Sequence, residues 1–178
     1  VVAAEEAAID SAAEQLRAHG GAVRPVRVDL RSPEGVDELY ATCTATGPLD
    51  VAALNAGIGM GGPFLDNDIE SEQAIIDLNV TSTVRLAKHV LRGMAARGAG
   101  RVLITSSIAS TMPGTYQAVY NASKSFVQSF AEALRNELKD TGVTVTALMP
   151  GPTDTNFFDR AEMQDTKVGS SSKDDPAV

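Results

Sequence analysis

A tyrosine and a lysine stand four residues apart in the stretch YNASK, and this pairing suits proton transfer. Residues 118–140 follow a helical pattern, so Tyr120 and Lys124 fall on one helix face, close enough to interact. A phenol, with an unperturbed pKa of about 10, is a poor acid or base at neutral pH. A neighbouring ammonium stabilises phenolate and lowers that pKa, which makes the pair a candidate for general acid–base catalysis. The same spacing also arises by chance on ordinary helix surfaces.

Two further polar residues could complete such a site. Ser107 directly follows the apolar run RVLITS, so the fold could bring its hydroxyl toward the phenol of Tyr120. Asn79, in LNV, interrupts a helical pattern with a side chain that competes for backbone hydrogen bonds. Two interpretations of Asn79 stay open: a mild helix irregularity, or a kink that holds a water next to Lys124.

A glycine-rich stretch, LNAGIGMGG, contains Gly57, Gly59 and Gly62 in the pattern G-x-G-x-x-G. In dinucleotide-binding proteins the last glycine of this pattern opens a helix whose N-terminal amides face the cofactor phosphates. Here Pro63 and a polar segment follow, and no helical pattern begins before about Asp68. We therefore do not expect this stretch to be the phosphate cradle.

Strand and helix patterns alternate along the chain. Apolar spacing predicts helices near residues 9–16, 33–43, 68–97 and 118–140, and strands near 1–4, 22–28, 48–54, 100–107 and 142–150. Ser32 and Pro33 suit the N-cap and the first position of the second helix. This order predicts an α/β fold: a doubly wound, mostly parallel sheet with helices on both faces, in one domain over residues 1–178. The strand at 48–54 is apolar almost throughout, so we expect both of its faces to be covered. The polar run 161–178 is expected to be flexible.

Polar and glycine-rich residues gather where the predicted strands end. In sheets of this kind, ligands bind at the carboxyl ends of the strands. The residues found there are Asp29, Asn55 to Gly57, Ser106, Ser107 and Pro150 to Thr155. This coincidence is the first indication of a ligand site.

Composition excludes several classes of function. The chain has 178 residues, a net charge of −8 and 43% hydrophobic residues, which suits one domain with a substantial core. The acidic balance argues against a nucleic-acid partner, which needs clustered lysines and arginines. A single cysteine, Cys43, excludes an intrachain disulfide and a cysteine-built metal cluster, and we expect no metal site. No stretch is long and apolar enough for a membrane span, so we expect a cytoplasmic protein.

Five motifs in order resemble the short-chain dehydrogenase/reductase family over about residues 1–160. They are NAG after a strand, LNV, GRVLITSS, YNASK and PGPTDT. The resemblance implies a Rossmann-like fold and an oxidoreductase that transfers hydride between NAD or NADP and a carbonyl or alcohol substrate. In this family the glycine-rich phosphate loop follows a first strand, so we expect that strand and loop upstream of Val1. The family's last strand is expected beyond Val178.

The resemblance also assigns roles to residues. It implies that Tyr120 is the catalytic acid or base, that Lys124 lowers its pKa and binds the nicotinamide ribose, that Ser107 holds the substrate oxygen, and that Asn79 supports a proton-relay water. Asp29 would face the adenine amino group. The full set of implied cofactor contacts is Asp29, Leu30, Asn55, Ala56, Gly57, Tyr120, Lys124, Pro150, Gly151, Thr153 and Thr155. The substrate pocket would involve Met112, Tyr116, Phe157 and Phe158, whose mostly apolar side chains indicate a hydrophobic or mid-sized molecule.

Alternatives to a hydride-transfer enzyme remain open at this point. The chain could be a family member that uses NAD internally for epimerisation or dehydration, a non-catalytic nucleotide sensor or scaffold, or an inactive fragment.

Association is expected as well. Two predicted helices carry more apolar surface than one sheet face needs: Val84, Ala87 and Leu91 on one, and Phe126, Phe130 and Leu134 on the other. We therefore expect a homodimer or homotetramer that pairs through the helices around 80–95 and 118–140.

Overall fold

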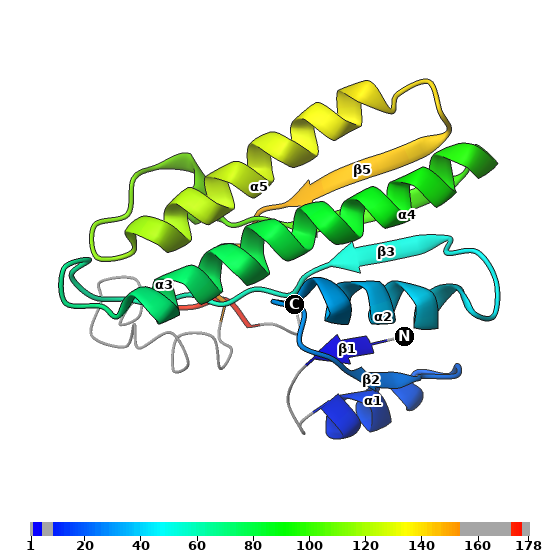
Figure 1. Ribbon diagram of the computed structural model, residues 1–178, viewed down its shortest axis with the longest axis horizontal. Coiled ribbons are helices and arrows are strands. Elements are labelled where there is room, and N and C mark those ends of the chain that lie inside the picture. The colour runs from blue at the N-terminus through cyan, green and yellow to red at the C-terminus, as the bar shows by residue number, and fades with distance from the viewer. Residues whose placement is uncertain (1, 5–8, 154–171, 176–178) are drawn as a thin grey trace.

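Helices and parallel strands alternate in the structure, a computed structural model that describes residues 2–4, 9–153 and 172–175 (Figure 1). This order confirms the alternation expected from the sequence. Thr155, Phe157, Phe158 and most of the polar run 161–178 lie outside the described residues. The elements are β1 (Val2–Ala4), α1 (Ile9–Arg17), β2 (Pro25–Arg27), α2 (Pro33–Thr44), β3 (Val51–Leu54), α3 (Ile69–Ile75), the π-helical segment η1 (Ile76–Ser82), α4 (Thr83–Arg97), β4 (Gly100–Thr105), the 3-10 segment η2 (Ile108–Thr111), α5 (Ala118–Glu137) and β5 (Val143–Leu148).

All strand pairings are parallel. β1 pairs with β2, and a second ladder runs in the order β3–β4–β5. In the second ladder Leu54 lies beside Ile104, which lies beside Ala147, so the three strands end together. Residues that directly follow these strands therefore meet at one edge of the sheet, which is where ligands bind in parallel α/β folds.

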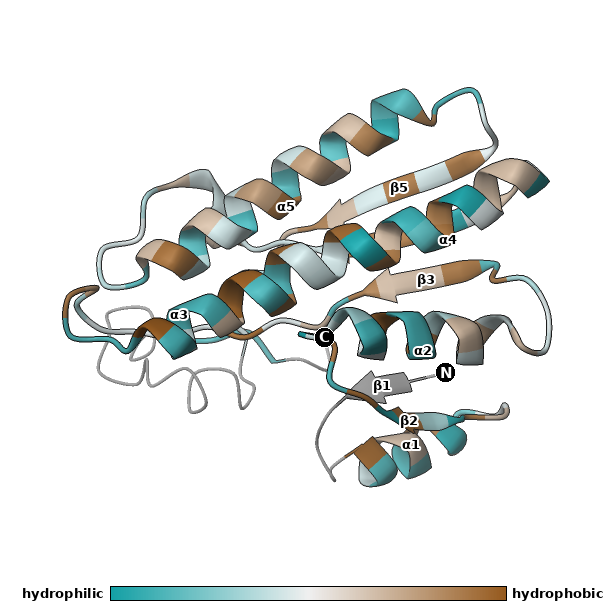
Figure 2. Cartoon of the chain, in the orientation of Figure 1, coloured by the Kyte–Doolittle hydropathy of each residue, from teal (hydrophilic) through white to brown (hydrophobic). Residues whose placement is uncertain are grey.

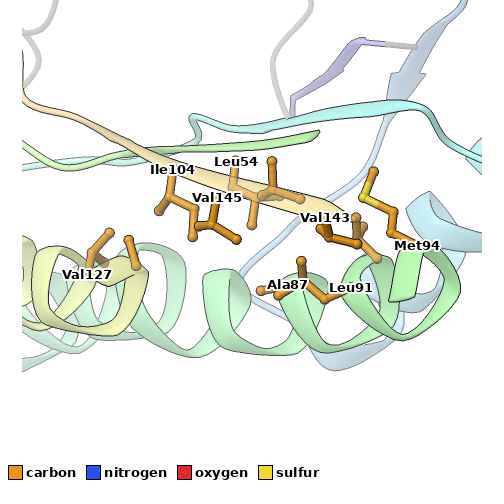
Figure 3. Packing of buried hydrophobic residues seen from close by; sticks show 11 residues of the cluster. Leu54, Ala87, Leu91, Met94, Ile104, Val127, Val143 and Val145 are labelled. Carbon is orange, nitrogen blue, oxygen red and sulfur yellow. The ribbon is translucent and has the colours of Figure 1, made fainter. Parts of the chain in front are cut away.

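Helices α4 and α5 cover one face of the β3–β4–β5 sheet. Figure 2 shows that both helices carry hydrophobic and hydrophilic residues in alternation, as amphipathic helices do. Their apolar residues pack against inward-facing strand residues in one continuous core (Figure 3). Ile104, on the central strand, has no exposed surface. Members of this core include Leu54, Ala87, Leu91, Met94, Ile104, Val127, Val143 and Val145.

The structure corrects the expectation that strand 48–54 is covered on both faces. Leu54 is buried, but Val51 is 60% exposed and Ala53 is also exposed. Among the described residues β3 pairs only with β4, which makes it an edge strand, and α4 covers only one of its faces. Within the described part of the chain, Val51 and Ala53 are therefore accessible on the side that α4 does not cover.

The two long helices also expose less apolar surface than the sequence predicts. Ala87 and Leu91 face the sheet and are buried in the core, and Phe130 packs partly against the same core. Phe126 remains exposed and stacks on Phe130, with 6.0 Å between the ring centroids. Val84 and Leu134 are half-buried, so of the six residues Phe126 is the one that is exposed.

Helix α2 is fixed at its start and along its length. Ser32 caps it by accepting a hydrogen bond from the amide of Gly35 (3.0 Å), as the Ser-Pro pair predicts. Along its length Asp37 accepts hydrogen bonds from Arg85 Nε (2.9 Å), and it lies 2.9 Å from His89 Nε2. The hydrogen bond from Arg85 holds the pKa of Asp37 below its ordinary value. These contacts join α2 to α4.

None of the described helices is long and apolar enough to cross a lipid bilayer.

Replacing Ile104 with alanine should lower the free energy of unfolding by about 2–5 kcal/mol, because the change leaves a cavity at a fully buried position. Ile69→Ala makes the same chemical change at a side chain that is 66% exposed, and it should change stability by no more than about 0.5 kcal/mol. Urea unfolding followed by circular dichroism measures both. Equal losses in the two variants would contradict the assignment of the core.

Candidate active site

Two adjacent serines directly follow β4, and each makes a hydrogen bond to a different residue of α5. Ser106 is buried, and its hydroxyl donates to the backbone oxygen of Lys124 (3.0 Å). Ser107 instead hydrogen-bonds through its side chain with Tyr120, while its Oγ accepts from the amide of Ala109 (3.1 Å). Ser106 thus holds the helix to the sheet, and Ser107 provides the hydroxyl beside the phenol.

Tyr120 and Lys124 lie together on the buried side of α5. Tyr120 is 8% exposed and Lys124 is 6% exposed. The Lys124 ammonium lies 6.0 Å from the centroid of the Tyr120 ring. Its Nζ donates to the backbone oxygen of Thr105 (3.0 Å) at the end of β4. The helical spacing therefore brings both side chains, together with Ser107, to the carboxyl end of the sheet.

Burial sets the pKa values of this pair and corrects the expectation for the tyrosine. Burial raises the pKa of Tyr120 above its usual 10, and the hydrogen bond with Ser107 only partly opposes that rise. Burial also lowers the pKa of Lys124 to about 8. A low-dielectric environment disfavours phenolate and ammonium alike. The expectation that Lys124 holds the phenol below its ordinary pKa is therefore wrong for this structure.

Asn79 lies at the centre of the site because of a local change in helix type. Between α3 and α4 the chain forms the π-helical segment η1, as an interruption of the helical pattern in LNV indicates. The Asn79 side chain is 1% exposed and makes three hydrogen bonds. Its Oδ1 accepts from the amide of Ile58 (2.9 Å), and its Nδ2 donates to the oxygen of Ile58 (2.9 Å) and to Ser123 Oγ (3.0 Å).

Gly57 allows the chain after β3 to pass close to these groups. A Cβ at this position would lie 3.2 Å from Asn79 Oδ1 and 3.2 Å from Lys124 Nζ, tighter than ordinary contact. Nearby, Asn55 Oδ1 accepts from Thr105 Oγ1 (2.9 Å), and Ala56 is exposed. The NAG turn therefore lies against Lys124 and Asn79 at one end and the end of β4 at the other.

Asp29, which follows β2, is held by Arg31. Its carboxylate accepts from the amide and Nε of Arg31 (both 2.9 Å) and from a terminal guanidinium nitrogen (3.0 Å). The side-chain hydrogen bond from Arg31 lowers the pKa of Asp29, so this carboxylate is ionised at neutral pH. Leu30 is buried against a second small core with Val28 and Val36, which fixes the end of this strand.

The segment that follows β5 lies beside the segment that follows β4. The amide of Ile108 donates to the oxygen of Pro150 (3.0 Å), which continues the β4–β5 pairing beyond the strands. Thr153 Oγ1 donates to the oxygen of Gly151 (3.1 Å). Thr153 also forms a parallel bridge with Asp174, whose amide donates to the oxygen of Pro152. The cofactor contact expected at Thr155 lies outside the described residues.

Sequence reasoning missed three residues that orient the site. Thr105 accepts from Lys124 through its backbone and bonds Asn55 through its side chain. Ser123 donates to the oxygen of Tyr120 (2.7 Å) and accepts from Asn79. Asn121 Nδ2 donates to the backbone oxygens of Ala109 (3.0 Å) and Met112 (3.1 Å). For Asn121 and Ser123 the available signal was their place inside YNASK, because a buried polar side chain needs a partner.

The chain is similar to known dehydrogenases over most of its length. A family model described as short chain dehydrogenase matches residues 1–166. The chain is 34% identical to estradiol 17-beta-dehydrogenase 1 of Rattus norvegicus over 84% of this chain and 44% of that protein. It is also 34% identical to 3-oxoacyl-[acyl-carrier-protein] reductase of Synechocystis over 81% and 59% of the two chains. The chain spans about half the length of the curated relatives it matches.

Solved structures share the fold. A short-chain dehydrogenase from Sphingobium yanoikuyae in complex with NADPH superposes with a TM-score of 0.87 at 26% identity, over 97% of this chain and 68% of that one. L-sorbose reductase from Gluconobacter frateurii, complexed with NADPH and L-sorbose, gives a TM-score of 0.81 at 29% identity, over 94% and 65% of the chains. The likeness supports the doubly wound Rossmann fold.

The lowered pKa of Lys124 makes stability depend on pH. Between the folded pKa of about 8 and the ordinary value of 10.5, the unfolded chain binds more protons, so the free energy of unfolding should rise with pH across this window. The shift corresponds to on the order of 3 kcal/mol. Lys124→Met, which has no titrating group, should lack this rise. Urea unfolding from pH 7.5 to 10 measures the difference, and parallel pH profiles for the two proteins would contradict it.

Proposed function

Because the chain belongs to the short-chain dehydrogenase/reductase family, we propose that it forms the reaction centre of an oxidoreductase that transfers hydride between NAD or NADP and a carbonyl or alcohol carbon. The observation that carries this proposal is the hydrogen bond between Ser107 and Tyr120, with the Lys124 ammonium beside the phenol ring. These three groups gather at the carboxyl end of a parallel sheet, where the fold binds ligands.

The residues present fit a nicotinamide dinucleotide. Asp29 accepts three hydrogen bonds from Arg31, and a carboxylate offers about four acceptor sites, so it can accept another from an adenine amino group. The Lys124 ammonium carries three N–H donors and uses one on Thr105, so it has donors left for the hydroxyls of a ribose. When bound, the cofactor supplies or accepts the hydride.

In the direction of carbonyl reduction, Tyr120 acts as the general acid. Its raised pKa keeps the phenol protonated at neutral pH, so it can give that proton to the substrate oxygen. Ser107 donates a hydrogen bond to the same oxygen and fixes its position. Lys124, with a pKa of about 8, changes its protonation near neutral pH and can return a proton toward the phenol. Alcohol oxidation uses the same groups in reverse, with Tyr120 accepting the proton.

The substrate proposed for this site is an apolar or mid-sized carbonyl or alcohol compound. Met112 and Tyr116 lie on the segment between Ser107 and Tyr120, and both side chains are more than half exposed. An apolar lining with a few polar groups is typical of small-molecule sites.

Two further proposals concern the whole protein. We propose a homodimer or homotetramer that pairs through α4 and α5, and the exposed Phe126 on α5 supports it. We also propose a cytoplasmic location, which the single cysteine and acidic composition support.

Tyr120→Phe removes one hydroxyl and almost no volume, so it tests the proton donor directly. In the full natural polypeptide that contains this chain, the variant should lose about 10²–10⁴ in kcat for reduction of aldehydes or ketones. Tyr40→Phe removes the same atom on α2, where the ring stacks on His89, and should leave kcat unchanged. Oxidation of NADPH followed by absorbance measures both.

Binding of NADPH followed by its fluorescence separates this proposal from a nucleotide sensor. Wild-type protein that binds NADPH but turns over no member of a panel of aldehydes, ketones, sugars and acyl-thioester ketones would favour the sensor. A Tyr120→Phe enzyme within threefold of wild type would overturn the assigned role of the phenol.

A further inference from the structure

The backbone of Tyr116 has an unusual conformation. Its φ is 65°, and among the described residues it is the non-glycine residue with a positive φ. A side chain in this left-handed region is strained, so neighbouring contacts must hold it there. The carbonyl of Tyr116 accepts a hydrogen bond from the amide of Gly62 (2.9 Å), the last glycine of the glycine-rich stretch.

Gly62 is itself held in a conformation that suits only glycine. Its φ is 122°, and a Cβ there would lie 2.5 Å from Asn67 Oδ1. Asn67 in turn donates through Nδ2 to Glu72 Oε1 (2.8 Å), and Glu72 is buried in α3. Asn67, which α3 holds through this hydrogen bond, therefore occupies the space that a side chain at position 62 would need.

The other end of the same segment is also anchored. The amide and the oxygen of Ile58 both bond the Asn79 side chain. The stretch from Ile58 to Asn67 is thus tied to η1 at one end and to α3 at the other. Gly62, between these anchors, makes the hydrogen bond that reaches Tyr116.

Tyr116 leads directly into the helix that carries the reactive phenol. The amide of Gln117 donates to the oxygen of Gly114 (3.1 Å), and the amide of Asn121 donates to the oxygen of Gln117 (2.9 Å). Tyr120 lies in this first turn of α5, where its side chain meets Ser107. A shift at Tyr116 would therefore change where the phenol lies relative to Ser107.

We propose that the stretch Ile58–Asn67 is a positioning loop, in which Gly62 holds Tyr116 in its left-handed conformation and thereby fixes the Tyr120 hydroxyl against Ser107. Gly62 and Tyr116 are positioning residues and touch no reacting atom in this role. The last glycine of the G-x-G-x-x-G pattern thus serves the reaction end of the site rather than cofactor phosphates. The expected effect on turnover rests on the proposed function.

Gly62→Ala tests the loop in the full natural polypeptide. The alanine is strained at this φ and crowds Asn67, so we expect the backbone at position 62 to shift and its hydrogen bond to Tyr116 to weaken. We expect kcat to fall by about 10–10²-fold with little change in the affinity for NADPH, because a small misplacement of a catalytic group is costly. Gly47→Ala is the matched control: its φ is 144°, no atom lies within 4 Å of the added Cβ, and kcat should not change.

A second pair of variants distinguishes positioning from general destabilisation. Tyr116→Gly keeps the carbonyl acceptor and adopts a positive φ without strain. The hydrogen bond from Gly62 is then less important for holding residue 116 in this conformation. Gly62→Ala should therefore cost less in a Tyr116→Gly background than in the wild type. Likewise, Glu72→Gln keeps an acceptor for Asn67 and should retain kcat, whereas Glu72→Leu should lower it. Equal losses from Gly62→Ala in both backgrounds would overturn the proposal.

A readout that needs no turnover keeps this inference separate from the proposed function. The titration of Tyr120 can be followed by ultraviolet difference absorbance, taken against Tyr120→Phe. Gly62→Ala should shift this titration because it changes the contact with Ser107, and Gly47→Ala should not. If the wild type reduces no carbonyl, the proposed function fails and this titration alone decides the inference. An unshifted titration in Gly62→Ala would overturn it.

Discussion

The hydrogen bonds of one buried amide, that of Asn79, connect the parts of the site that come from distant stretches of the chain. Its oxygen and nitrogen hold both backbone groups of Ile58 after β3, and its nitrogen also reaches Ser123 in α5. Each buried polar group that loses its partner costs about 1–3 kcal/mol, so these three bonds strongly favour one arrangement. The NAG turn, the π-helical segment and the helix of Tyr120 are thereby fixed relative to one another.

Burial of the reactive pair has a chemical consequence. The surroundings disfavour charge on Tyr120 and on Lys124, so the phenol stays protonated and the lysine loses its proton more easily than in water. A protonated phenol suits the reduction of a carbonyl, which needs a proton donor. Oxidation of an alcohol needs phenolate, which this environment makes costly.

Local patterns in the sequence predicted the elements well, because helix periodicity and capping depend on nearby residues. The Ser32-Pro33 start, the interruption at Asn79 and the shared face of Tyr120 and Lys124 are features of this kind. Properties that depend on distant neighbours were not predicted. The apolar residues of strand 48–54 do not reveal that Val51 and Ala53 are exposed in the described part of the chain. The spacing within YNASK does not reveal how deeply the phenol is buried, and burial decided the direction of its pKa shift.

One long helical stretch, from α3 through η1 to α4, supports both ends of the site. Glu72 in α3 fixes Asn67 beside Gly62, and Asn79 in η1 fixes Ile58. Farther along, Arg85 and His89 in α4 contact Asp37 in α2. Helix α2 begins at Pro33, shortly after Asp29 and Arg31. Gly35 reinforces this link, because α2 approaches the backbone oxygen of Asp29 too closely for any Cβ. The adenosine end and the reaction end of the proposed site are thus held by one continuous element. Since neighbouring contacts on a rigid helix cannot move independently, this arrangement fixes the distance between the two ends more firmly than separate loops could.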